Sequence, residues 1–307
     1  MLPFLARRAL SALAVIWLAA SLAFVALRWA PGDALDATLA RSGASEDTIA
    51  ARRAALGLDD PLPLQYLRYW LDTVRGRWGA SLVSGQPVVD LLAENALPTL
   101  TLALATLAVA LALGVALGVT AGLGRPAALR WLADAIAALT LATPVYWTAT
   151  LAIYVFTVAI GLFPGLGGEG PRALILPALV LGFHTAGSIA RVTAASVRDA
   201  ARGDFVRTAR AKGLPEPDVL DHILRVGLLP VVSVAALQAG FLLGGTVITE
   251  MIFVRRGLGQ VLLSAVTHRD YPVVQGLVVL SALVYTTLNA AADVLYHRLD
   301  PRVRRES

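Results

Sequence analysis

The side chains that most often perform covalent chemistry are scarce in this sequence. It has four histidines, one lysine and no cysteine among 307 residues. Lys212 is followed by a glycine and is not the lysine of a G-x-x-x-x-G-K-[ST] phosphate-binding loop. No H-E-x-x-H zinc motif and no G-x-S-x-G nucleophile turn is present. The sequence therefore predicts no catalytic residue, no metal site and no cofactor bound by this chain.

A different chemistry is available to polar side chains that lie within long apolar segments. Such side chains are costly in a membrane, and they often mark the pathway of a transported solute or proton. A hydrogen bond across a helix pair explains them equally well, so a purely structural role remains open. One of them, Glu250, is close to the end of its apolar run and could lie at the membrane interface. The candidate pathway residues are His184, Gln238, Glu250, Gln275 and Asn289.

One charged stretch, FVRTARAKGLPEPDVLDHILRVGLLP over residues 205–230, lies between apolar runs. We predict two short helices around a turn. The first covers Ala200–Lys212 and ends where Gly213 takes a left-handed conformation. Two prolines follow, and the second helix begins at an N-cap, Asp218, and runs to Leu229. A compact helix of this kind could dock against another protein, although a solvated loop over lipid headgroups is the alternative.

The elements that must position these residues are long and apolar. The chain is 57% hydrophobic and 15% charged, with a mean hydropathy of +0.69, whereas soluble domains carry about 25% charge. Net charge is +5, but the basic residues flank apolar runs, which favours a membrane protein over a nucleic-acid partner. The charge-free runs are Ala9–Leu27, Asn95–Gly124, Ala135–Gly168, Ala173–Ala190, Val226–Thr249 and Tyr271–Ala292.

Each of these six runs is long enough to cross the roughly 30 Å hydrocarbon layer as a helix. The third run contains Pro144 near its start and should form one kinked helix of about 22–28 residues. The first run follows two arginines, as a signal peptide does, but its apolar stretch is longer than a signal peptide needs. We therefore expect an uncleaved first span.

Six spans place both termini on one side of the membrane. The short loops on the other side carry only four arginines, Arg172, Arg255, Arg256 and Arg269. By the positive-inside rule both termini and the charged stretch are cytoplasmic. The long segment after the first span is then external, and its sequence suggests a short helix starting near Ser45. This segment could meet an external partner or merely pack on the bundle.

Glycines at every fourth residue allow close approach of membrane helices. One row is in the second apolar run and the other is in the fifth. A seam of this kind could slide during a transport cycle or pack statically, and spacing alone does not separate the two. The predicted packing residues are Gly114, Gly118, Gly122, Gly240 and Gly244.

The charged stretch resembles the coupling loop of type I ABC importer permeases, in the version typical of the dipeptide, oligopeptide and nickel permeases. That family has an EAA…G pattern followed by LP. Ala209 and Gly213 match its core, and Leu229–Pro230 supplies the closing pair, whereas Arg207 and Thr208 stand where the general pattern has Glu and Ala. Other segments resemble the same family: APGDAL, LGLDDPLPLQYLRYW, GASLVSGQPVVDLL, ILPALVLG, RDYPVVQG and YHRLDPRVR.

The resemblance implies an all-α polytopic membrane protein with the type I ABC importer permease (MetI-like) fold, in the bacterial inner membrane. Its implied divisions are a first transmembrane helix (1–30), an extracytoplasmic segment (31–93), a five-helix permease domain (94–297) with the coupling loop at about 198–230, and a cytoplasmic tail (298–307). The chain departs from the family at Arg256, where a proline usually precedes the glycine.

The implied partners are a second similar permease, two ABC ATPase subunits that bind ATP and Mg, an external substrate-binding protein and membrane lipid. This chain would form half of a translocation pathway, most often for peptides in this subfamily, with nickel or another small solute as alternatives. A stand-alone carrier or channel is the alternative from another class, and a membrane enzyme is a third. The residues implied to contact the ATPase are Phe205, Arg207, Thr208, Ala209, Arg210, Lys212, Gly213, Leu229 and Pro230.

Overall fold

The computed structural model describes residues 2–29, 46–55, 57, 59–124, 126–168 and 170–299. The APGDAL segment and the tail after residue 299 were subjects of prediction and lie outside the described residues. The short helix expected near Ser45 is confirmed, since a helix begins at Glu46. In the described part of the chain the regular elements are all helices, apart from one isolated antiparallel bridge between Ala80 and Pro87. This confirms the predicted all-α class.

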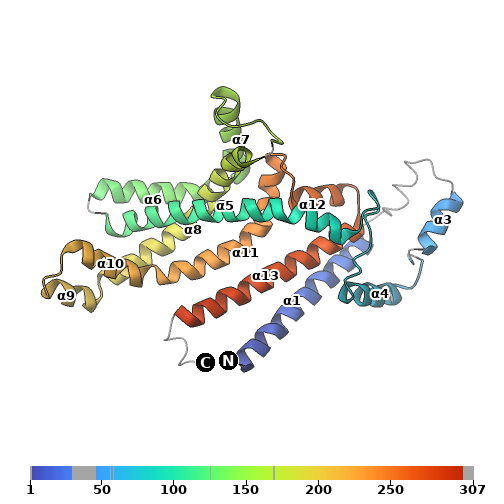
Figure 1. Ribbon diagram of the computed structural model, residues 1–307, viewed down its shortest axis with the longest axis horizontal. Coiled ribbons are helices and arrows are strands. Elements are labelled where there is room, and N and C mark those ends of the chain that lie inside the picture. Colours follow the sequence, from blue (N-terminus) through green and yellow to red (C-terminus); the bar gives the residue numbers. More distant parts are fainter. Residues whose placement is uncertain are drawn as a thin grey trace. The chain divides into compact units, whose positions relative to one another are not determined.

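The helices follow one another along the chain as Figure 1 shows. They are α1 (Leu2–Trp29), α3 (Glu46–Ala55), α4 (Leu62–Val74), α5 (Val88–Leu123), α6 (Ala127–Ala142), α7 (Val145–Ala152), the π-helical η1 (Ile153–Ala159), α8 (Pro171–Ala201), α9 (Asp204–Ala211), α10 (Glu216–Gly227), α11 (Leu229–Ile252), α12 (Leu258–Thr267) and α13 (Tyr271–Leu299). The chain divides into two compact units, Met1–Pro98 with Arg256–Thr286 and Thr99–Arg255 with Thr287–Ser307.

Four of the described helices, α1, α5, α8 and α13, are long and apolar enough to cross a membrane without a break. Two bent pairs, α6 with α7–η1 and α10 with the first part of α11, bring the number of candidate spans to six. The third run does not form the one kinked helix that was expected, because it is broken into two helices. The chain bends by 104° between α6 and α7, because Pro144 has no N–H and holds Thr143 in an extended conformation with ψ 138°.

Two of the helices continue well beyond the apolar runs that predicted them. α5 has 36 residues and α8 has 31, so at 1.5 Å per residue they are about 54 and 46 Å long. α8 runs through Arg191 and Arg198 without interruption, because arginine and alanine are good helix formers whether or not they lie in lipid. The fourth run, the shortest in the sequence, therefore belongs to a helix that is longer than the roughly 30 Å hydrocarbon layer.

In the first unit, two of the segments that carry the family resemblance are joined to each other. Asp270, just before α13, accepts hydrogen bonds from the Ser81 hydroxyl and from the Leu82 amide, the latter at 3.1 Å. Both Ser81 and Asp270 are buried. Gly276 lies against Val88, since a Cβ added to it would be 2.6 Å from Val88 Cγ1. The start of α5, the preceding turn and the start of α13 thus share one small core.

In the second unit, α8 packs against α6, α7, α10 and α11. Its contact with α5 is made by the predicted glycine row. A Cβ on Gly114 would be 2.7 Å from Ile189 Cβ, one on Gly118 would collide with Thr193, and one on Gly122 would be 3.0 Å from the Ala194 carbonyl. The row therefore lets two backbones approach closely, as small residues do between membrane helices.

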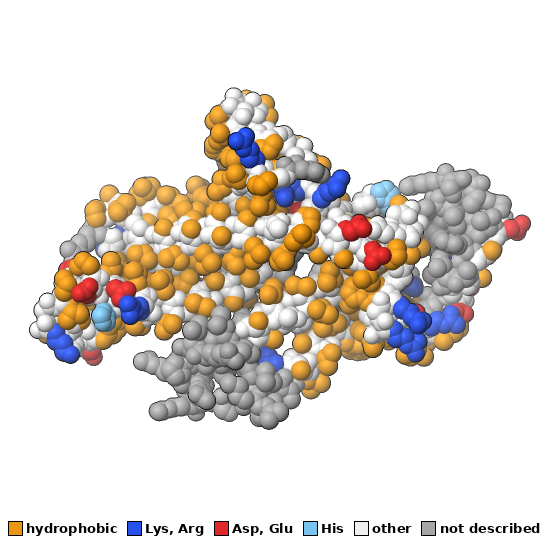
Figure 2. Space-filling view, viewed as in Figure 1, with side chains coloured by type: hydrophobic (Ala, Val, Ile, Leu, Met, Phe, Trp, Pro, Cys, Tyr) orange, Lys and Arg blue, Asp and Glu red, His pale blue; other side chains and the backbone are white. Residues whose placement is uncertain are grey.

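The second predicted glycine row does not pack in the same way along α11. Gly240 is buried, but a Cβ added to Gly244 would meet nothing within 4 Å. Hydrophobic side chains cover most of the helix surface that is visible in Figure 2, and charged side chains gather near helix ends. An apolar outer surface of this kind suits contact with lipid.

Candidate functional site

The charged stretch folds as the α9–α10 hairpin, residues 204–227, built directly on the end of α8. Val197 and Ala200 of α8, Val206 and Ala209 of α9, and Val219 and Ile223 of α10 form one buried cluster. The Ser196 hydroxyl donates a 2.6 Å hydrogen bond to the Gly227 carbonyl. The hairpin is therefore packed on a helix that crosses the membrane. It is not a loose loop.

The end of α9 depends on one glycine. Gly213 has φ +76°, a conformation that residues with a side chain rarely adopt. Its N–H bonds to the Arg210 carbonyl at 3.0 Å, and the Leu214 N–H bonds to the Ala209 carbonyl at 3.2 Å, which is the Schellman arrangement. The predicted left-handed helix end at Gly213 is confirmed. Leu214 packs against the hairpin core, so the turn and the core support each other.

Two details of the predicted hairpin are wrong. The first helix does not run from Ala200, because the chain becomes extended at Gly203 between α8 and α9. Asp218 is not an N-cap but lies in the first turn of α10, which begins at Glu216 after Pro215. Proline is tolerated at the first positions of a helix, where its missing N–H has no helical partner. Pro217 is therefore the second residue of α10, and the helix begins before this proline and not after it.

The outer face of α9 is basic and exposed. Arg207 lies 3.9 Å from Asp204, Arg210 lies 3.1 Å from Glu216, and the side chains of both pairs are exposed. Lys212 is exposed and forms no ion pair within the described part of the chain. Ion pairs as exposed as these are worth little, typically about 0–1 kcal/mol. The guanidinium groups are therefore easily available to a partner.

The residues implied to make the ATPase contact divide into surface and core. Phe205, Thr208 and Gly213 are exposed together with the basic residues of α9, whereas Ala209 is only 8% exposed and faces α8 and α10. Leu229 and Pro230 begin α11 and are exposed. Ala209 thus holds the hairpin together and does not itself offer a contact surface.

His184 joins the two parts of the bent span. Its Nδ1 donates to the Thr140 carbonyl of α6 at 2.9 Å, and its Nε2 pairs with the Thr148 hydroxyl of α7 at 3.0 Å. The Thr140 carbonyl would normally bond to the N–H of the residue four positions on, which is Pro144 and has none. The histidine supplies that missing donor. The side chain is therefore a brace across the bend.

Glu250 is completely buried near the end of α11 and not at an exposed interface. Its Oε1 accepts a 2.7 Å hydrogen bond from the Thr99 hydroxyl of α5. The neighbouring Thr246 and Thr249 are also buried. A buried carboxyl group needs such donors because its desolvation is costly. The pair ties α5 to α11 within the second unit.

The other candidate pathway residues are divided between the two units. Gln238 is half-buried in α11 and Asn289 is half-buried in α13. Gln275 is buried in the first unit, close to the start of α13. His184 hydrogen-bonds to Thr140 and Thr148, and Glu250 accepts a hydrogen bond from Thr99. None of these three contacts joins two of the five candidates.

The structure also shows partners that the sequence did not single out. They are Thr140 and Thr148 for the histidine, Thr99 for the buried glutamate, and Ser196 for the hairpin. Threonine and serine give weak signals in an apolar run, since their hydroxyls often bond to their own helix. The one available signal was Pro144, which predicts an orphan carbonyl four residues earlier.

The chain has up to six candidate membrane spans, helices packed closely at glycines, and a basic helical hairpin at the end of one span. These features define an α-helical multi-pass membrane protein. The family described as "Binding-protein-dependent transport system inner membrane component" matches residues 114–305. A second family, described as "Binding-prot-dependent transport system membrane comp, N-term", matches residues 1–105. The chain belongs to this family. It is a multi-pass inner-membrane permease subunit of an ABC importer, and the resemblance noted in the sequence is confirmed.

Two relatives illustrate how far the similarity extends. The glutathione transport system permease protein GsiC of Salmonella paratyphi A and that of Escherichia coli K12 are each 37% identical over 308 residues, covering 99% of both chains. Among solved structures, the inward-facing MetNI methionine ABC transporter matches 70% of this chain and 98% of its own with a TM-score of 0.59 at 19% identity. An amino acid ABC transporter matches 68% and 94% with a TM-score of 0.55 at 14% identity. These structures share the fold.

Proposed function

We propose that this chain forms half of the translocation pathway of an ATP-driven peptide importer. A second permease subunit would complete the pathway, two ATPase subunits would bind ATP and Mg below it, and a substrate-binding protein would deliver the solute from outside. Both termini and the α9–α10 hairpin would lie in the cytoplasm. Peptides are the proposed substrates because the relatives named above are glutathione permeases, and glutathione is a short peptide.

The observation that carries this proposal is the joint between α8 and the α9–α10 hairpin. α8 is one helix from Pro171 to Ala201, and its last turns contribute Val197 and Ala200 to the hairpin core. A force applied to α9 therefore reaches the membrane span without passing through a flexible linker. Transport by alternating access needs such rigid-body transmission.

The proposed contact surface is the exposed face of α9. Arg207, Arg210 and Lys212 would face acidic or polar groups of an ATPase cleft, while Val206 and Ala209 keep the helix docked. ATP-driven closure of the ATPase pair would draw the hairpins of the two permeases together. Each α8 would then move with its hairpin, and the pathway would change the side to which it opens.

A cysteine cross-link tests this assignment, since the chain has no cysteine of its own. Thr208→Cys places a thiol on the exposed face of α9, and Arg225→Cys places a thiol at another exposed position, near the other end of the hairpin, as a matched control. We expect Thr208→Cys to cross-link to a cysteine in the ATPase cleft, with yields that change on ATP binding. Its thiol should react with a membrane-impermeant reagent only after the cells are permeabilised.

Three results would refute parts of the proposal. Equal cross-linking at both positions would remove the specific role of α9. Labelling of intact cells would reverse the orientation. Uphill solute accumulation by the chain without any ATPase would overturn the coupling itself. The substrate is tested separately by mass spectrometry of the ligand that the partner binding protein retains, where nickel or a non-peptide solute would overturn the peptide assignment alone.

A further inference from the structure

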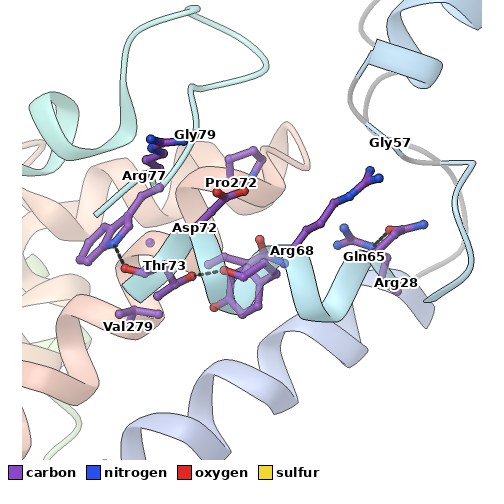
Figure 3. A pocket seen from close by; sticks show the side chains of 14 residues that line it. Arg28, Gly57, Gln65, Arg68, Asp72, Thr73, Arg77, Gly79, Pro272 and Val279 are labelled. Carbon is purple, nitrogen blue, oxygen red and sulfur yellow. Dashed lines mark hydrogen bonds between the residues drawn. The ribbon is translucent and has the colours of Figure 1, made fainter. Parts of the chain in front are cut away.

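The first unit contains a pocket of about 280 Å³ that the function proposed above does not use. Its walls come from the end of α1, one side of α4, the segment that precedes α5, and the start of α13. In Figure 3, Arg28, Gln65 and Arg68 lie toward one end of the pocket, and Thr73, Arg77 and Val279 lie toward the other.

The pocket lies at a membrane surface, because two spans reach it at their ends. Arg28 is the last residue but one of the span Arg7–Trp29, and Gln275 is the fifth residue of the span Tyr271–Ala291. Val279 is eight residues into α13, about 12 Å from the start of the helix at 1.5 Å per residue. The pocket therefore extends from the headgroup level toward the acyl chains.

Aromatic side chains surround the same level. Phe24, Tyr66, Tyr69 and Trp70 pack on one another between α1 and α4, with ring centroids 5.4–6.5 Å apart. Trp78 lines the pocket and donates a 3.3 Å hydrogen bond to the Thr73 carbonyl. Tyrosine and tryptophan are enriched where membrane spans meet the headgroups. Their position agrees with the one that the helix ends define.

The charge of the lining suits an anion. Three guanidinium groups, those of Arg28, Arg68 and Arg77, line the pocket together with one carboxylate, that of Asp72. Arg68 bonds to Asp60, whereas Arg77 is exposed and forms no ion pair among the described residues. Guanidinium groups bind phosphate oxygens through charge-assisted hydrogen bonds.

A buried donor in the wall has no partner. Gln275 is 9% exposed and lines the pocket, and its Nε2 makes no hydrogen bond in the described structure. A buried donor without an acceptor is unfavourable, so such groups usually face a ligand or water. An oxygen-rich group in the pocket would satisfy it.

The outward side of α4 is apolar. Leu64, Leu67, Leu71 and Val74 recur at helical spacing, and they are 38%, 56%, 46% and 80% exposed. The opposite side of α4 is held against α1, where Tyr66 pairs with Ser21 and Gln65 accepts a 2.9 Å hydrogen bond from Arg28. A short amphipathic helix at this level suits insertion into the headgroup boundary.

We propose that this pocket binds the headgroup of an anionic phospholipid, with the apolar side of α4 lying in the boundary between headgroups and acyl chains. Arg77 and Arg28 would hold the phosphate, and Val279 would face the upper part of an acyl chain. Bound lipid would fix α4 and the end of α1 at the membrane surface. Zwitterionic lipids would bind less tightly, because their amine adds a positive charge beside the arginines.

Native mass spectrometry of the full-length protein, purified with its partners, tests the pocket. Vesicles of phosphatidylglycerol are the probe, with phosphatidylcholine vesicles and inorganic phosphate as separate arms. Arg77→Gln should weaken phosphatidylglycerol binding about tenfold, as expected for one charge-assisted hydrogen bond. Arg75→Gln is the matched control, since Arg75 is exposed just after α4 and does not line the pocket, and it should leave binding unchanged.

Equal binding by the two arginine variants would overturn the pocket as the site. Binding of inorganic phosphate without phosphatidylglycerol would overturn the assignment to lipid. For α4, a nitroxide label at Leu67→Cys should be more accessible to oxygen than to a polar nickel complex in lipid nanodiscs. A label accessible to neither would show that a protein partner covers this side, and that result would also overturn the proposal.

Discussion

Replacing His184 with leucine should destabilise the protein by removing the brace across the bent span. Leucine is similar in size to histidine, so the change mainly removes two hydrogen bonds. The Thr140 carbonyl is then left without a donor, because Pro144 cannot replace it, and Thr140 is only 2% exposed. An unsatisfied buried carbonyl costs about 1–3 kcal/mol and the lost bond to Thr148 about 1 kcal/mol. We expect a loss of about 2–4 kcal/mol.

Two further variants separate the two bonds. Asparagine at position 184 places its amide donor close to the position of Nδ1, so His184→Asn should keep the bond to Thr140 and lose only about 1 kcal/mol. Thr148→Val removes the partner of Nε2 alone and should cost a similar amount. The measurement is the free energy of unfolding in SDS, followed by tryptophan fluorescence of the purified protein.

The reasoning fails if His184→Leu unfolds with the same free energy as the unmodified chain. It also fails if His184→Asn is no more stable than His184→Leu, since the bond to the Thr140 carbonyl would then contribute nothing. Transport assays add a second distinction. A stable His184→Asn variant that has lost transport would restore the histidine to the pathway and reduce its bracing role to a secondary one.

Gly118→Leu should prevent close packing of α5 on α8, lower the free energy of unfolding by at least about 1–3 kcal/mol and lower the yield of folded protein. Gly244→Leu is the control, since a side chain at Gly244 meets open space, and it should leave the stability of the isolated chain unchanged in the same SDS titration. Ala209→Leu should overpack the hairpin core and abolish binding-protein-stimulated ATP hydrolysis in proteoliposomes. Thr208→Leu, on the exposed side of α9, should reduce this hydrolysis less. Equal effects of the two variants would contradict a structural role for Ala209. Burial raises the pKa of the Tyr69 phenol. The stability that the protonated phenol contributes is therefore complete below about pH 10, its unfolded-state pKa, and is lost as the pH rises through its higher folded-state pKa. Spectrophotometric titration at 295 nm should show a late-titrating phenol that Tyr69→Phe removes.

The sequence by itself determined the features that depend on neighbours along the chain. Apolar runs long enough for the bilayer predict the spans, since hydrogen bonding in lipid leaves a helix as the local solution. Gly213 predicts a helix end, because a glycine, which has no side chain, adopts the left-handed conformation easily. The family-like segments predicted a permease, and the whole-chain similarity to known permeases confirms it.

Only the tertiary structure decided which face of each helix is covered and which polar groups meet. Glu250 finds its donor 151 positions away, and Ser81 finds Asp270 across 189 positions. Ala209 matched a motif, yet its burial follows from how α8 and α10 pack around it. Hydropathy and propensity are sums over adjacent residues, whereas these contacts depend on the approach of helices that are distant in sequence. That approach is set by the fit of side chains across each helix pair, as where Gly114 and Gly118 meet α8.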